Sequence, residues 1–136
     1  MKRLLTDHVS NPCNDNLTIN ASDEVGSGGA HHLYEISGFD LSTNPSYPES
    51  LKAEESTDYV LLLPFQNGPI GEVGVNGITH EVLLAILIDR MRSFQSGQFA
   101  CRENALALTK LEEALMWLNR RTASRVSRGV EGTHTV

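Results

Sequence analysis

One aromatic residue and three arginines recur at helical spacing near the end of the sequence. They are Trp117, Arg121, Arg125 and Arg128, separated by steps of four, four and three residues, so in a helix they share one face. An aromatic ring offers a stacking surface to a flat base, and guanidinium groups donate paired hydrogen bonds to phosphates. The combination predicts a site for a small phosphorylated molecule that carries a base, which is a nucleotide.

The same residues also admit a structural interpretation. Cations in the last turns of a helix stabilise it by roughly 0.3–1 kcal/mol each through the helix dipole, which would account for Arg125 and Arg128. A tryptophan such as Trp117 more often belongs to the core than to a ligand platform. The dipole does not explain why Arg120 and Arg121 are both arginine rather than lysine, whereas phosphate recognition or ring stacking does. Arg121 is therefore the arginine most expected to contact a ligand.

A second group of residues surrounds a break between two helical runs. Phe94 could be an apolar plug at a helix end, but it lies four residues after Arg90 and close to Gly97. Glycine lets a ligand approach the backbone closely, which favours a ligand contact at Phe94. Asn104 could be a surface group or a local cap, or its amide could donate and accept hydrogen bonds at a purine edge.

We expect no metal, no cofactor and no catalytic residues. The histidines and the two cysteines lack metal-ligand spacings such as C-x₂-C or H-E-x-x-H. Neither cysteine has a histidine pattern typical of a nucleophile. The run Gly26-Ser27-Gly28-Gly29 is not a nucleophile elbow, and it precedes a strand-like run where a dinucleotide fingerprint would open a helix.

Composition and charge limit the class of ligand. The chain has 136 residues, 40% of them apolar, and a formal net charge of −6, which fits one domain or one domain with an appendage. Residues 1–78 hold three basic and eleven acidic residues, whereas 79–136 hold eight basic and six acidic ones. The net negative charge argues against long DNA or RNA, whose binding neutralises many phosphates. A few arginines suffice for two or three phosphates.

The sequence also bears on compartment. No run reaches the roughly 18 apolar residues of a membrane helix, and the start Met1–Leu5 meets Asp7 and His8 before the apolar core of a signal peptide develops. Cys13 and Cys101 lie far apart, and nothing else indicates an oxidising compartment. We expect a cytoplasmic protein with no membrane partner.

The local patterns predict an α+β fold. Residues 1–16 are polar and predict a loose terminus. Residues 17–78 predict a small, irregular antiparallel β portion. The expected strands are Leu17–Asn20, His31–Ile36 and Tyr59–Leu63. Asn67-Gly68 is a hairpin signal and predicts a further strand to Val75, although Pro64 and Pro69 weaken the pairing.

Residues 79–136 predict a long antiparallel helical hairpin. Thr79 is the expected N-cap of a helix to about Phe94, and a second helix should run from near Cys101 to Ser127, ended by Gly129. The expected core stripe of the second helix is Ala105, Leu108, Leu111, Leu115 and Leu118. The first helix is apolar on every side from 82 to 88, so we expect it to pack on two sides, against its partner helix and against another subunit.

Four segments in the same order resemble one known family. They are GGAHHLYEI at 28–36, FQNGPI at 65–70, FQSGQFACREN at 94–104 and RGVEGTH at 128–134. Together they look like the bacteriophage anti-Thoeris and anti-CBASS sponge proteins, which share a helical hairpin domain. The resemblance covers roughly residues 28–36 and 59–134, and residues 1–27 match nothing that can be placed.

The resemblance implies sequestration of cyclic nucleotide defence signals without catalysis. Those signals include glycocyclic ADP-ribose and, in some members, cyclic di- or trinucleotides. Family members form dimers that often assemble into hexamers, with ligand sites between protomers. By similarity, Phe94 stacks on a base, Asn104 contacts a base and Arg121 stacks on the ligand. Arg102, with Thr109, resembles a second site for cyclic trinucleotides.

Two other functions remain open at this point. One is a hydrolase that cleaves such a signal, which would need a general base and an activated water or nucleophile. The other is a phage structural or DNA-binding hairpin protein. We expect the protein to act in the cytoplasm of an infected bacterial host.

Overall fold

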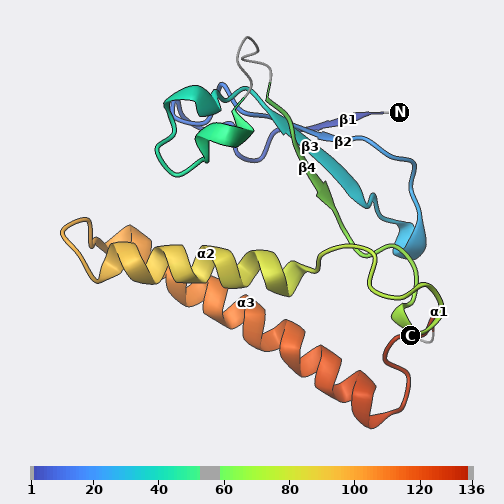
Figure 1. Cartoon of the computed structure of the whole chain (residues 1–136). Coiled ribbons are helices and arrows are strands. Elements are labelled where there is room, and N and C mark those ends of the chain that lie inside the picture. Colours follow the sequence, from blue (N-terminus) through green and yellow to red (C-terminus); the bar gives the residue numbers. More distant parts are fainter. Residues whose placement is uncertain (1, 53–58, 135–136) are drawn as a thin grey trace. The chain divides into compact units, whose positions relative to one another are not determined.

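The computed structural model describes residues 2–52 and 59–134, which divide into two compact units at 1–67 and 68–136. The first unit contains the sheet and the second contains the helices (Figure 1). The predicted α+β class, with an antiparallel sheet followed by long helices, is therefore confirmed. In the described ranges, no helix is both long and apolar enough to cross a bilayer.

The sheet is a four-stranded antiparallel meander in the order β1-β2-β3-β4. Its strands are β1 Arg3–Leu5, β2 Thr18–Ala21, β3 Leu33–Ser37 and β4 Leu61–Pro64. The register pairs Ala21 with Tyr34 and Tyr34 with Leu63, so these side chains share one face. Within the segment expected to be loose, residues 3–5 pair with β2. Short 3₁₀ helices at Ser27–Gly29, Leu41–Thr43 and Glu49–Leu51 lie in the connections.

One glycine fixes how the chain leaves β3. Gly38 has φ +93, and a Cβ built on it would lie 1.7 Å from the carbonyl oxygen of Asn16. No side chain fits at that distance, and L-residues rarely adopt that φ. Gly38 therefore allows the turn after β3 to pass directly against the segment that leads into β2.

The predicted strand after Asn67-Gly68 is wrong. Residues Ile70–Val73 instead form the one-turn helix α1. Pro69 has no N–H for a ladder and its φ of −69 suits a helix start, and its carbonyl accepts hydrogen bonds from the N–H groups of Glu72 and Val73 at 3.0 and 2.9 Å. Two prolines around a turn signal thus favour a helical turn over a second paired strand.

The helical hairpin consists of α2, His80–Gln95, and α3, Arg102–Ser127. The predicted N-cap is confirmed, because the Thr79 side chain accepts a hydrogen bond from the N–H of Val82. The predicted stop is confirmed too. Gly129 has φ +72, its N–H donates to the Val126 carbonyl and the N–H of Val130 donates to that of Arg125, which is a Schellman motif.

The two helices pack through one face each. Ile88 is the most buried residue of α2, at 3% exposed, and Arg92 of α2 forms an ion pair of 2.7 Å with Glu112 of α3. On α3 the predicted stripe is confirmed at Leu108, Leu111, Leu115 and Leu118, which are all partly covered. Ala105 is exposed, so its assignment to the stripe is wrong. Asn104, four residues before Leu108, takes the inward position in the first turn.

Three apolar side chains of α2 remain exposed outside its contact with α3. Val82, Ile86 and Leu87 are 47%, 53% and 46% exposed. Within the second unit, α3 therefore packs on only one of the two faces of α2 that the sequence pattern predicts to be packed.

Candidate functional site

An aromatic group lies where α2 ends. Phe94 is 41% exposed, so it is a surface ring and not a buried plug. The guanidinium of Arg90, one turn earlier, lies over the ring at 5.7 Å from its centroid. The ring of Phe99, from the loop that follows, meets Phe94 edge to face at 6.3 Å. These contacts hold one ring in a defined orientation while part of its surface stays accessible.

The loop between α2 and α3 is held by its own polar groups. The side-chain oxygen of Gln95 accepts a hydrogen bond from the N–H of Cys101 at 2.9 Å, and the Cys101 Sγ accepts one from the N–H of Asn104 at 3.4 Å. Cys101 is thus the N-cap of α3, and the interpretation of Asn104 as the cap is wrong. The side-chain amide of Asn104 lies in the first turn of α3 and is not used as the cap.

Gly97 is not required by the fold of its own chain. It is absent from the positive-φ glycines, and a Cβ built on it would lie 3.9 Å from its nearest neighbour, the Ser93 carbonyl oxygen. A side chain would therefore fit. We define the tip cluster as Arg90, Phe94, Gly97, Phe99 and Asn104.

The predicted helix face with Trp117 and the arginines lies at the other end of α3. Trp117 is 54% exposed, so its interpretation as a core residue is wrong. The guanidinium lying over its ring, at 5.5 Å from the centroid, is that of Arg120, while Arg121 is exposed on the neighbouring part of the helix. We define the arginine cluster as Trp117, Arg120, Arg121, Arg125 and Arg128.

Arg125 differs from the other arginines because it is buried, at 8% exposed. Its Nε donates to a carboxylate oxygen of Glu131 at 2.9 Å, and its Nη2 donates to the carbonyls of Val130 and Thr133 at 3.0 and 3.3 Å. Those residues belong to the segment after α3, which we call the C-terminal strap, residues 129–134. Arg125 therefore anchors this strap to the helix.

The strap is also joined to α1. The N–H of Gly71 donates to the carbonyl of Gly132 at 3.1 Å, and His134 lies 3.7 Å from a carboxylate oxygen of Glu72. The end of α3 that carries the arginine cluster is therefore linked to α1 through the C-terminal strap.

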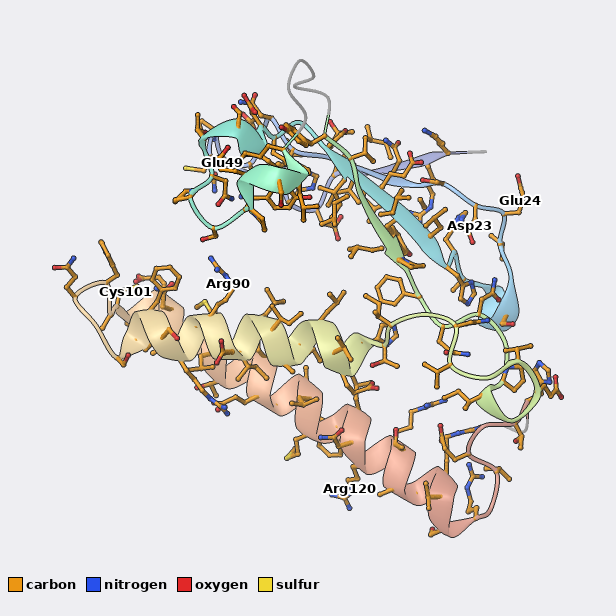
Figure 2. All side chains as sticks on the ribbon, viewed as in Figure 1. Asp23, Glu24, Glu49, Arg90, Cys101 and Arg120 are labelled. Atoms are coloured by element: carbon orange, nitrogen blue, oxygen red, sulfur yellow. The ribbon has the colours of Figure 1, made fainter. Side chains whose placement is uncertain are left out.

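The two clusters lie at opposite ends of one helix. Figure 2 shows Arg90 and Cys101 towards the end where the helices are joined and Arg120 towards the other end of α3. Asn104 and Arg121 are 17 residues apart within α3, which corresponds to roughly 26 Å at 1.5 Å per residue. A ligand the size of a dinucleotide cannot contact both clusters of one chain.

The residues predicted for a second site are close to each other. Arg102 and Thr109 are both exposed on α3. Seven residues, or two turns, separate them, so they lie on one face at a spacing of roughly 10 Å. Arg102 begins the helix, next to the tip cluster in sequence.

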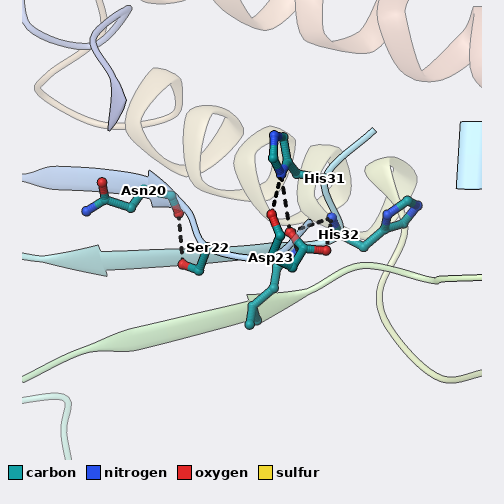
Figure 3. A network of polar contacts seen from close by, with 6 residues as sticks. Asn20, Ser22, Asp23, His31 and His32 are labelled. Atoms are coloured by element: carbon teal, nitrogen blue, oxygen red, sulfur yellow. Dashed lines mark hydrogen bonds and ion pairs between the residues drawn. The ribbon is translucent and has the colours of Figure 1, made fainter. Parts of the chain in front are cut away.

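The first unit contains a separate polar network around Asp23, shown in Figure 3. The Asp23 carboxylate accepts hydrogen bonds from the N–H of His32 at 2.9 and 3.2 Å and from that of Leu33 at 3.2 Å. His31 Nδ1 donates to the Asp23 carbonyl at 2.8 Å and lies 3.5 Å from the carboxylate. Burial raises the pKa of the Asp23 carboxyl, but these backbone hydrogen bonds and His31 outweigh it and leave the pKa below its ordinary value.

This network holds the loop before β3 and resembles no metal site. Across residues 2–52 and 59–134, no three histidine, cysteine or acidic side chains gather as metal binding would require.

Sequence reasoning did not select two residues that the structure places at the clusters. One is Phe99, which lies five residues after Phe94 in the loop between the helices. The available signal was a second phenylalanine so close to the first. Glu131 had no such signal, because its contact with Arg125 depends on the turn at Gly129.

The match to a family model lies mainly in the second unit. Residues 64–123 match the model of the Acb2/Tad1 hairpin domain. A curated relative, Thoeris anti-defense 1 of Bacillus phage SBSphiJ7, is 63% identical over 70 residues, which make up 52% of this chain and 49% of that relative. The chain thus matches about half the length of this relative. The matched range of the domain model contains the whole tip cluster together with Trp117, Arg120 and Arg121, while Arg125 and Arg128 lie beyond it. The helical hairpin of this chain is therefore similar to the Acb2/Tad1 hairpin domain.

Proposed function

We propose that this protein binds and sequesters cyclic nucleotide defence signals without degrading them, and so acts as a phage anti-defence protein in the cytoplasm of an infected host. The related phage protein is named for its action against the Thoeris defence system. The proposed ligand is glycocyclic ADP-ribose, with cyclic di- or trinucleotides as further candidates.

The observation that carries the proposal is the division of the predicted site between the two ends of α3. A second hairpin placed antiparallel to the first brings the tip cluster of one chain to the arginine cluster of the other. Because such a pair has two-fold symmetry, the arrangement occurs twice and yields two equivalent sites. Each site then contains the aromatic and amide groups of one protomer and the guanidinium groups of its partner.

The exposed apolar face of α2 supports this pairing. Ile86 lies on the side of α2 opposite the buried Ile88, with Val82 one turn before it and Leu87 at the flank. Apolar side chains along a helix face in a soluble chain mark a contact surface. We propose that a second copy covers this face, and that such dimers assemble further into a hexamer.

The chemistry of the two clusters suits a cyclic ligand with bases and a pyrophosphate. Phe94 and Arg121 would stack on opposite faces of a base, and Asn104 would read its edge. Arg128 of the partner would attract the two phosphates, while the buried Arg125 would hold the strap beside them. Trp117 extends the aromatic surface, and Gly97 allows the ligand to lie against the loop backbone.

A second type of site is proposed at Arg102 and Thr109. Both side chains are exposed on one face of α3, and a guanidinium with a hydroxyl fits a phosphodiester. A cyclic trinucleotide would need several copies of this pair, which a hexamer supplies.

Recovery of intact ligand tests sequestration. The protein is mixed with an equimolar amount of glycocyclic ADP-ribose, freed of unbound ligand by gel filtration and then denatured by heat. The proposal predicts that chromatography returns the ligand unchanged and stoichiometric with protomers. A cleaved product would make the protein a hydrolase, and passage of the ligand entirely in the unbound fraction would refute binding.

A further inference from the structure

We infer that Arg120 is a positioning residue, which covers one face of the Trp117 ring and so holds the other face open to a base of the ligand. Arg120 acts through the ring and does not itself contact the ligand. The inference rests on the proposed function, because the ligand is the same nucleotide.

Helical geometry places Trp117 between two arginines. Arg120 and Arg121 follow it by three and four residues, so they lie one turn later, roughly 60° to one side of its direction and 40° to the other. The guanidinium of Arg120 lies over the ring at 5.5 Å from its centroid. Arg121, which we propose to stack on the ligand, is exposed on the flank that Arg120 does not occupy.

No carboxylate draws Arg120 away from the ring. Two other arginines of the hairpin are held in ion pairs, Arg92 with Glu112 at 2.7 Å and Arg125 with Glu131 at 2.9 Å. In the part of the chain that the structure describes, Arg120 forms no ion pair. A cation is attracted to the face of an aromatic ring, and most strongly to that of tryptophan. The indole ring is therefore the partner that fixes this guanidinium.

The tip cluster contains the same arrangement. The guanidinium of Arg90 lies over the ring of Phe94, 5.7 Å from its centroid and four residues earlier on α2. Figure 2 shows Arg90 and Arg120 on the two different ends of the hairpin. Both rings still have accessible surface, since Phe94 is 41% and Trp117 54% exposed. Each aromatic surface of the proposed site is thus backed by an arginine of its own helix.

Backing by a cation reduces what the ligand must do on binding. A long aromatic side chain on a helix has two common χ1 rotamers, and fixing one of them during binding costs conformational entropy. A ring that Arg120 already holds does not incur that cost again. Because an exposed cation–π contact is modest, its loss should weaken ligand binding by about two- to fivefold.

The first test replaces Arg120 by alanine in the full chain. Trp117 is the only tryptophan of the sequence, so the fluorescence of the protein above 300 nm excitation-selected for indole reports on that ring alone. Without ligand, Arg120→Ala should shift the emission to longer wavelength and make its quenching by acrylamide faster, since the ring loses its cover. Titration calorimetry with glycocyclic ADP-ribose should show the affinity lowered by about two- to fivefold.

A double-mutant cycle separates positioning from direct contact. In a Trp117→Ala protein, the further change Arg120→Ala should leave the affinity as it is, because Arg120 then has no ring to hold. An arginine that bound a phosphate itself would lower the affinity by the same factor in both backgrounds. Arg120→Lys, which keeps a cation for the ring, should bind more tightly than Arg120→Ala when Trp117 is present and equally when it is alanine.

Lys110→Ala is the matched control for charge. It also removes one positive charge from an exposed position of α3, where Lys110 is 77% exposed, and should change neither the emission of Trp117 nor the affinity.

The outcomes distinguish the inference from the function on which it rests. If the unchanged protein binds glycocyclic ADP-ribose but Arg120→Ala has the same effect with and without Trp117, or no effect, the positioning role is wrong and the proposed function stands. Unaltered emission of Trp117 in Arg120→Ala would refute the contact itself. Loss of helicity by circular dichroism, or of association in sedimentation, would also overturn the inference, since Arg120 would then be structural. If the unchanged protein does not bind the ligand, the proposed function itself fails.

Discussion

Replacing Ile86 by aspartate should separate the protein into monomers and abolish ligand binding without unfolding the hairpin. Ile86 is 53% exposed in the single chain and lies on the side of α2 opposite the buried Ile88. The substitution leaves the tip cluster and the arginine cluster untouched. It therefore tests whether these clusters need a second copy.

The magnitude follows from the exposed fraction. Complete burial of an isoleucine side chain is worth about 1.5–3 kcal/mol, and about half of this surface is still open, so burial in a dimer contributes about 1 kcal/mol per chain. Two-fold symmetry doubles the loss to about 2 kcal/mol. Two carboxylates forced into an apolar contact add at least as much again. A total of about 4 kcal/mol weakens the dimer roughly a thousandfold.

Sedimentation velocity between about 1 and 50 µM should thus show Ile86→Asp as a monomer. Its circular dichroism should remain helical, with a thermal midpoint below that of the unchanged protein because the stabilisation by association is lost. Val75→Asp is the matched control, since Val75 is 79% exposed and lies outside the helices. It should remain associated. A dimeric Ile86→Asp protein, or a monomeric one that still binds glycocyclic ADP-ribose tightly, would refute the reasoning.

Three other substitutions test single positions. Gly97→Ala should change the free energy of unfolding by less than about 0.5 kcal/mol, because the added Cβ has room, yet weaken ligand binding at least tenfold in a calorimetric titration; unchanged affinity would remove Gly97 from the site. Gly38→Ala should destabilise the first unit by more than about 2 kcal/mol, because its Cβ would overlap the Asn16 carbonyl. Gly28→Ala, also at positive φ but with open space around it, should cost only about 1 kcal/mol, and equal urea midpoints for the two variants would contradict the clash. Asp23→Asn should lower the thermal midpoint at neutral pH. The folded pKa of Asp23 lies below its ordinary value of 3.8, so the stabilisation by its carboxylate is complete above that value and is lost as the pH falls through the folded pKa. The difference in thermal midpoint between the two proteins should therefore narrow below about pH 3.8. A difference that stays constant down to pH 2 would exclude the carboxylate as its source.

The helical part of the fold was the more predictable because its signals are local. Thr79 caps α2 and Gly129 ends α3 in the predicted manner, and both act within one turn of the residue that carries them. The leucines of α3 follow a 3.6-residue period over several turns. The one wrong residue in that stripe, Ala105, lies in the first turn, where the repeat has no preceding turn to fix its phase.

The strands were less predictable because their partners are distant in sequence. The strand β1 has only three residues, and it forms its hydrogen bonds with β2, whose first residue is Thr18. The sequence near Arg3 therefore contains no local pattern that predicts a strand. At Asn67-Gly68 the hairpin signal competes with Pro69. The proline prevails because a missing N–H weakens a strand ladder but not the first turn of a helix.

Among the candidate site residues too, those set by local signals were predicted and those set by more distant contacts were not. The break around Gly97 indicates that Phe94 and Asn104 flank a helical turn, and the structure places both there. The burial of Arg125 was not predicted, although its position seven residues after Leu118 puts it beside the leucine stripe as well as beside Arg121. Its burial depends on Glu131 and the strap carbonyls, and the strap reaches them only through the reversal at Gly129.

The central claim is that each ligand site combines the tip cluster of one chain with the arginine cluster of another, and mixing two inactive variants tests it most directly. Phe94→Ala and Arg121→Ala are each expected to fold and to bind glycocyclic ADP-ribose far more weakly. In a mixed dimer, one site has both wild-type residues and the other has neither. Equal amounts of the two variants, unfolded together and refolded to exchange subunits, should therefore recover about a quarter of the wild-type number of high-affinity sites. No recovery, with mixed dimers demonstrated by mass spectrometry, would contradict the account.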